Sequence, residues 1–147
     1  MKKCEYCGEE EVYSNMASHS RSVGDQRFSG MLPAELCNAC HQTNFSVEHL
    51  AAFNLAVAYL CATLKLTSPE AFKFMRAAIG ISDVEMAGFM GETVKTIRQW
   101  EDGSAEFGPG AFAVLRVYVE AEFNKYNIKV QAHNHPGQEI RCASKLK

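Results

Sequence analysis

Two pairs of cysteines are the feature that most constrains the fold of this chain. Cys4 and Cys7 form the first pair, Cys37 and Cys40 the second, and each pair has two residues between its cysteines. This spacing lets one tight turn present two thiolates to an ion, and two such turns complete a closed tetrahedral shell of four sulfurs. Gly8 suits such a turn because glycine tolerates a positive φ. We therefore predict one structural Zn²⁺ per chain, with four ligands: Cys4, Cys7, Cys37 and Cys40.

Other interpretations of these motifs are weaker. Cys37-Asn-Ala-Cys40-His41 matches the attachment pattern of c-type haem, but that chemistry requires export and would leave the first pair unused. His19 or His41 could replace a thiolate, although a polar surface histidine is the simpler interpretation of each. The 29 residues between Cys7 and Cys37 exceed the commonest spacing, and a strand-and-loop insert can absorb the excess.

Three further motifs have plain interpretations. His133-Asn134-His135 spells the name of the HNH nucleases, whose residues come from separate elements, so we interpret it as coincidence. Cys61 fits packing on the apolar face of a helix, and Cys142 fits an exposed thiol in the tail. Four thiolates leave no open metal position and no general base is evident, so we predict that the protein is not an enzyme.

Composition places the chain among soluble globular proteins. Apolar residues make up 47% and charged residues 22%, and no apolar stretch reaches the roughly 18 residues of a membrane span. The basic start of the chain is not followed by the apolar core of a signal peptide. We therefore expect a cytoplasmic protein without membrane contact, and in a reducing compartment paired cysteines favour a metal over disulfides.

The fold class that we predict is mainly α, with four segments. Residues 1–45 have too few large apolar side chains for a core of their own, so they form a small zinc-binding module with short strands near 11–14 and 27–30. Residues 46–66 form a connecting helix, apolar over much of its surface. Residues 67–124 form four helices. Residues 125–147 are a basic tail, loose or partly extended, with Ile128 and Val130 as candidate strand residues.

Local signals mark the helices between residues 67 and 124. Ser68 before Pro69, the capping box from Ser82 to Glu85, and Thr93 are the predicted helix starts. Glycines at 80, 91 and 103 mark the ends, and the last helix follows residues 108–110. Two short helices are therefore expected in the middle, one ending near residue 90 and the next near residue 101. Four apolar side chains can fill their shared core: Met86, Met90, Ile97 and Trp100.

The segment from Arg76 to Gly103 resembles the Xre/Cro-type helix-turn-helix family. The resemblance lies in the glycine turn, the Glu85-Met-Ala87 sequence and the closing Trp100-Glu-Asp-Gly. It implies an ion pair between Arg76 and Glu101 and a recognition helix in the major groove, whose base edges differ for every base pair. The DNA-contacting residues that it implies are Ser82, Val94, Lys95, Arg98 and Gln99.

Charge leaves the DNA question open. The chain has a formal charge of −2, and residues 69–124 carry 5 basic against 9 acidic residues. Asp83 stands where the family often has glutamine, beside the DNA backbone, where a carboxylate would repel phosphate. The tail carries 5 basic residues against 1 acidic one. These basic residues either contact phosphates or simply keep the protein soluble: Lys125, Lys129, Arg141, Lys145 and Lys147.

The order of the modules over residues 1–124 resembles the MqsA/YgiT-type antitoxins. That resemblance implies a homodimeric repressor of a palindromic double-stranded operator, whose zinc module binds a ribonuclease-type toxin. Lys95 and Gln99 differ from the asparagine and arginine of that family, so the operator sequence does not carry over. We predict a DNA-binding repressor with a structural zinc, an antitoxin in the sense of that family. The alternative is a protein-interaction adaptor whose acidic helical region no longer binds DNA.

Overall fold

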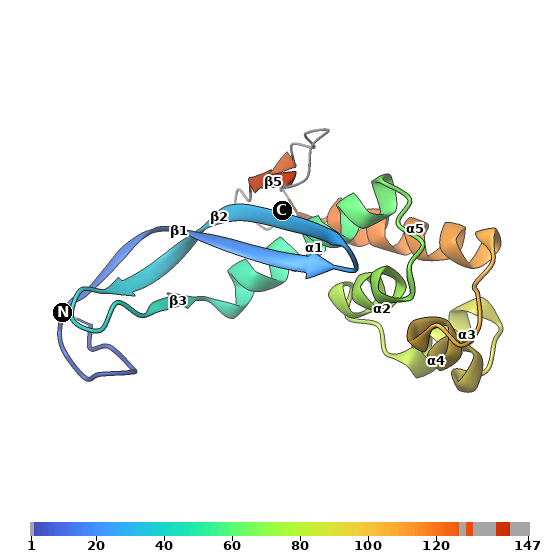
Figure 1. Cartoon of the computed structure of the whole chain (residues 1–147), viewed down its shortest axis with the longest axis horizontal. Coiled ribbons are helices and arrows are strands. Elements are labelled where there is room, and N and C mark those ends of the chain that lie inside the picture. The colour runs from blue at the N-terminus through green and yellow to red at the C-terminus, as the bar shows by residue number, and fades with distance from the viewer. Residues whose placement is uncertain (1, 127–128, 131–137, 142–147) are drawn as a thin grey trace.

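The computed structural model describes residues 2–126, 129–130 and 138–141. Three antiparallel strands come first in the chain and five helices follow (Figure 1). The hairpin and the helices lie along one long axis, with the N-terminus at one end and α3 and α4 at the other (Figure 1). The prediction of strands followed by helices is therefore confirmed.

A long hairpin dominates the N-terminal segment. β1 (Val12–Val23) and β2 (Gln26–Cys37) pair without interruption around a two-residue turn, in which Gly24 has a φ of 61°. β3 (Thr43–Phe45) pairs with the far end of β2. The expectation of only short strands was wrong. Serines fill much of β1, so the alternation is clear only in β2, where Phe28 and Leu32 are buried between more exposed neighbours.

The tail adds two strands to this sheet. β5 (Gln138–Arg141) runs parallel to β2 at residues 28–31, and β4 (Lys129–Val130) pairs antiparallel with β5. The prediction of a partly extended tail is confirmed at Val130. Several residues singled out above lie outside the described residues: Ile128, His133, Asn134, His135, Cys142, Lys145 and Lys147.

Helix α1 (Val47–Thr63) is the centre of the molecule. Ser46 caps it by accepting the backbone N–H of His49, and its middle is buried from Leu55 to Ala58. It contacts β2 of the hairpin and also α2 and α5. The predicted connecting helix is therefore a core element, and one continuous apolar cluster runs from Phe28 in the hairpin to Phe123 in the last helix.

Three of the other four helices start where the capping signals predicted, whereas the last starts at Pro109 and not after residue 110. The four helices are α2 (Pro69–Ala78), α3 (Asp83–Met90), α4 (Val94–Asp102) and α5 (Pro109–Phe123). Ser68, Ser82 and Thr93 each accept a backbone N–H in the first turn, and Gly91 and Gly103 end α3 and α4 in the left-handed conformation. In the described part of the chain, no helix is both long enough and apolar enough to cross a membrane.

Candidate metal centre and nucleic-acid interface

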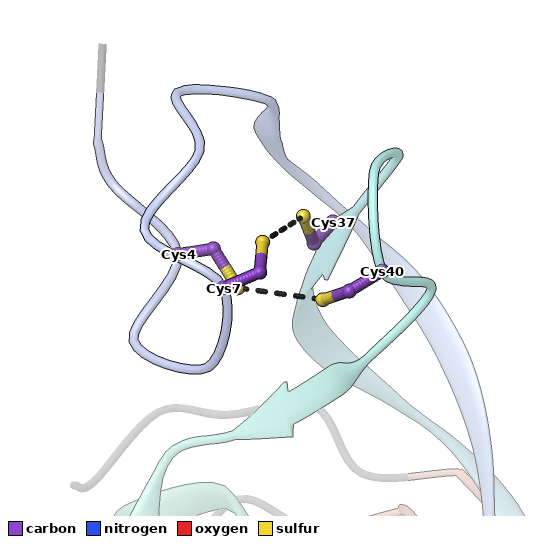
Figure 2. A group of neighbouring side chains, drawn as sticks. All are labelled: Cys4, Cys7, Cys37 and Cys40. Atoms are coloured by element: carbon purple, nitrogen blue, oxygen red, sulfur yellow. Dashed lines mark hydrogen bonds between the residues drawn. The ribbon is translucent and has the colours of Figure 1, made fainter.

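The four predicted cysteines meet at one end of the hairpin. All four Sγ atoms lie within 4.8 Å of one another, and they point toward a common centre (Figure 2). The Sγ atoms of Cys4 and Cys40 are 3.7 Å apart, as are those of Cys7 and Cys37. A tetrahedron with bonds of about 2.3 Å has edges of about 3.8 Å, the value expected for Zn²⁺ and thiolates. A disulfide requires about 2.05 Å. The cluster is therefore positioned to hold a metal ion.

The first cysteine pair lies in a turn closed by backbone hydrogen bonds. The N–H of Cys4 donates to the carbonyl of Glu9 at 2.9 Å, and the N–H of Gly8 donates to the carbonyl of Cys4 at 2.9 Å. Gly8 has a φ of 80°, which agrees with the reason for expecting glycine there. These bonds hold the two thiols on one side of the turn.

The second pair repeats the first, position by position. The N–H of Cys37 donates to the carbonyl of Gln42 at 3.1 Å, and the N–H of His41 donates to the carbonyl of Cys37 at 2.9 Å. His41 takes the place of Gly8 and has a φ of 60°. A side chain in this left-handed region costs about 1–2 kcal/mol. The second turn is therefore built like the first but stores strain at His41.

Protons compete with a metal ion for this cluster, because a thiol must lose its proton to become a ligand. Backbone N–H groups of Cys7 and Tyr6 lower the pKa of Cys4 to about 7. Backbone N–H groups also lower the pKa of Cys7 and Cys40, but desolvation and the neighbouring thiols outweigh them and raise the pKa of Cys7 to about 12. The Cys4 thiolate therefore forms readily, whereas a divalent ion has to displace the protons of Cys7 and Cys40, so metal binding releases protons.

Neither candidate histidine replaces a thiolate. In the described part of the chain, this metal-ligand cluster contains only the four cysteines. His41 is exposed, as predicted, but the surface interpretation of His19 was wrong: its ring lies 4.8 Å from that of Phe53 and 5.2 Å from that of Phe45. Desolvation, and then the charge of Arg21, lower the pKa of His19. The alternation of β1 turns this histidine inward against α1.

Cys61 is the buried thiol that the sequence predicted. It is fully buried in α1, and burial raises its pKa to about 12. A thiol of this kind is protonated at neutral pH and unreactive, so Cys61 contributes packing.

An ion pair ties α2 to α4. Two nitrogens of the Arg76 guanidinium, Nε and Nη2, donate hydrogen bonds to the carboxylate of Glu101. The third nitrogen, Nη1, donates to the carbonyl of Ile81 at 2.9 Å. The side chains of Arg76 and Glu101 are 14% and 8% exposed. These are the two residues for which the sequence implied an ion pair. Since Arg76 is occupied inside the protein, its role is structural.

The residues expected to contact DNA lie on or beside α4. Lys95 and Arg98 are exposed, and Gln99 is half-buried, while Ile97 and Trp100 of the same helix face the core. Val94 is half-buried and packs against the core. Ser82 is exposed at the start of α3, where its hydroxyl contacts the backbone N–H and the carboxylate of Glu85. The structure therefore places Lys95, Arg98 and Gln99 along one turn of α4.

Asp83 has a partner that the sequence did not reveal. Its carboxylate accepts a hydrogen bond from Arg98 Nε at 2.9 Å, and this bond is the main reason why its pKa lies below the ordinary value. Arg98 thus neutralises the acid expected to repel phosphate. The pair spans two helices, so no helical periodicity could predict it.

A search with the chain matched neither a protein-family model nor a curated protein. The functional assignment of both sites therefore comes from their residues and geometry.

Proposed function

We propose that this protein is a sequence-specific DNA-binding repressor with a structural Zn²⁺. The observation that carries the proposal is the arrangement of α3 and α4. Helices of 8 and 9 residues are joined by residues 91–93, with Gly91 in the left-handed conformation. Helix-turn-helix motifs join their helices by turns of about three or four residues that often contain glycine. Arg76 and Glu101 hold this pair of helices on α2.

The exposed side of α4 supplies the chemistry for reading bases. Lys95 can donate to guanine O6 and N7, and Gln99 can pair with adenine. The methyl groups of Val94 can meet a thymine methyl group. The N-terminus of α3 at Ser82 offers a backbone N–H and a positive dipole end to a phosphate. Arg98 reaches the same side of the protein, bound to Asp83.

The metal has a structural role in this proposal. Four thiolates close the coordination shell, so no position stays open for substrate or water. A tetrahedral site of four sulfurs favours zinc or iron. The Sγ separations of 3.7 Å in the pairs Cys4–Cys40 and Cys7–Cys37 are close to the edge of about 3.8 Å expected for zinc. Metal analysis of the purified protein should give one zinc per chain.

Repression requires a dimer, because two recognition helices then occupy half-sites about one turn of DNA apart. The helical end carries exposed apolar side chains that suit such a contact. Phe89 is 50% exposed and stacks on Tyr118 with ring centroids 5.1 Å apart, and Val117 is 63% exposed. The resemblance to the MqsA/YgiT-type antitoxins extends the proposal to an antitoxin that represses its own operon and binds a ribonuclease-type toxin.

A second candidate is an adaptor that binds protein instead of DNA. It is favoured by the pairing of Arg98 with Asp83 and by the excess of acidic residues between 69 and 124. Both features reduce the positive charge that attracts phosphates.

Selection from a random duplex library with zinc-loaded protein separates the two candidates. We expect the enriched duplexes to share a palindrome with half-sites one helical turn apart. Enrichment of duplexes without a common sequence would contradict base reading. No enrichment, even at low salt, would favour the adaptor.

A further inference from the structure

The outer edge of β1 has unpaired backbone groups. Within the described residues, β1 pairs with β2 and with no other strand. Facing residues of two antiparallel strands alternate between hydrogen-bonded and non-hydrogen-bonded pairs. The N–H of Asn38 donates to the carbonyl of Glu11, so Glu11 and Asn38, which face each other just before β1 and just after β2, form a hydrogen-bonded pair. Odd-numbered residues of β1 therefore direct their backbone groups toward β2. The even-numbered residues direct theirs outward: Val12, Ser14, Met16, Ser18, Ser20 and Ser22.

This edge lacks the features that usually protect an edge strand. Such strands are short, bulged, or carry charges and proline. β1 has 12 residues in unbroken register and no proline, and its single charge, Arg21, lies 4.7 Å over the ring of Phe74 in α2. Only Met16 has its outward N–H covered, by the side chain of Asn15 at 2.8 Å. The edge is therefore most accessible at residues 12–18, away from α2.

A cavity adjoins this part of the edge. It has a volume of about 570 Å³ and extends from β1 past β2 to β3 and the start of α1. Volumes of this size hold small ligands or side chains. Its lining includes Asn15, Asn44 and His49, together with an ion pair of 2.8 Å between Lys2 and Glu35. Polar groups that can orient a guest therefore stand beside the free edge.

The charge around this region is acidic. Lys2 and Lys3 are its basic residues, and each is paired with a glutamate, Glu35 and Glu10 respectively. Four thiolates around a divalent ion add negative charge. Further glutamates lie in the same segments: Glu5, Glu9, Glu11 and Glu48. A guest at this edge would gain from carrying positive charge.

We propose that β1 and this cavity bind an extended segment of a partner protein that contains lysine or arginine. The segment adds as a strand to residues 12–18, and one basic side chain enters the cavity beside Glu35. In such strand addition, main-chain hydrogen bonds give affinity and side-chain pockets give specificity. This region and α4 lie at opposite ends of the molecule (Figure 1), so the inference does not depend on DNA binding.

The probe is a display library of random 12-residue peptides, panned against the zinc-loaded full-length protein. We expect enriched peptides to contain lysine or arginine within an extended, β-prone sequence. Peptide binding should slow hydrogen exchange at the amides of Ser14 and Ser18 by about tenfold or more, the effect of one added hydrogen bond in a stable pair. Unchanged exchange at these amides, or enrichment of acidic peptides, would overturn the proposal.

Variants locate the contact. Ser14→Pro removes a free outward N–H and leaves the bonds from β1 to β2 in place, so we expect peptide affinity to fall about tenfold or more. Ser22→Pro is the matched control, because it changes the same kind of position outside residues 12–18. Ser14→Lys provides a second test by placing a repelling charge on the edge.

Further readouts separate the possible outcomes. One metal per chain and unchanged duplex selection with Ser14→Pro would show that the fold and any DNA binding are retained. Wild-type peptide affinity in both Ser14 variants would overturn the proposal. Conversion of a dimer to a monomer by Ser14→Pro would also overturn it, since a second copy of the chain would then occupy the edge.

Discussion

The two ends of this molecule are stabilised in different ways. At the helical end, Phe72, Met75, Met86 and Ile97 are fully buried around the contacts of α2, α3 and α4. At the cysteine end, on the far side of Leu32 from the helices, few side chains of the described residues are buried: Cys4, Ala34 and Cys37. Apolar burial therefore explains the helical end, while the cysteine end depends on hydrogen-bonded turns and on the ion that its thiols are placed to hold.

The largest effect should come from removing the metal. Apparent binding free energies of structural zinc are about 10–16 kcal/mol, so a chelator or Cys37→Ser should unfold the two cysteine turns. The amides of Gly8 and His41 should lose protection from hydrogen exchange, while those of α2 to α5 keep theirs. Cys61→Ala is the matched control and should retain one metal per chain. Loss of protection in α4 after chelation would contradict the difference between the two ends.

A smaller effect is expected at the helical end from the pair of Arg76 and Glu101. Removing one partner of a buried ion pair costs about 3 kcal/mol, because it leaves the other charge uncompensated. Glu101→Ala should therefore lower the free energy of unfolding by about this amount, measured by urea denaturation of the zinc-loaded protein.

The control for this experiment is an exposed pair on α5. Arg116 and Glu120 are 40% and 39% exposed, so Glu120→Ala should cost about 0.5 kcal/mol or less. Double-mutant cycles on both pairs give the coupling energies. Equal coupling in the two pairs would contradict the structural role given to Arg76.

Relieving strain at the second cysteine turn should strengthen the metal site. His41→Gly removes a side chain from a left-handed backbone position and should stabilise the folded turn by about 1 kcal/mol. Zinc affinity, measured by competition with a chelator, should then rise by about fivefold. Gly8→Ala is the opposite change at the matching position and should weaken binding. Weaker zinc binding by His41→Gly would contradict this prediction. It would show that the His41 side chain stabilises the metal site by more than its left-handed backbone conformation destabilises it.

The smallest effect concerns His19 and pH. Its folded-state pKa lies below its ordinary value of about 6.5, so the unfolded chain binds the proton more readily. Stability should therefore fall as the pH drops below about 6.5, until the folded-state pKa is passed. His19→Phe should flatten this slope in thermal melts between about pH 5 and pH 7 with zinc in excess. An unchanged slope would place its origin elsewhere.

The sequence predicted those parts of the fold that depend on neighbouring residues. Ser82 with Glu85 and the glycine at 91 act within a few residues, and the helix boundaries that they predicted are confirmed. The cysteine cluster was equally predictable, since two residues between thiols define each turn.

Features that depend on distant contacts were missed. The length of β1 is hidden by its serines, and the inward position of His19 follows from pairing with β2 and packing on α1. The bond of Asp83 to Arg98 joins separate helices, and the parallel pairing of β5 with β2 joins the two ends of the chain. Periodicity within one segment carries no information about such pairings.

The most direct test of the proposed function is a salt-dependent anisotropy titration with the duplex that the selection yields. We predict that Lys95→Ala and Gln99→Ala each weaken binding by about 1–3 kcal/mol and relax the preference at one base pair. The control is Lys73→Ala, which removes an exposed positive charge on α2 and should leave the base preference unchanged. Equal losses in Lys95→Ala and Lys73→Ala, with unchanged preference, would contradict the claim that α4 reads DNA.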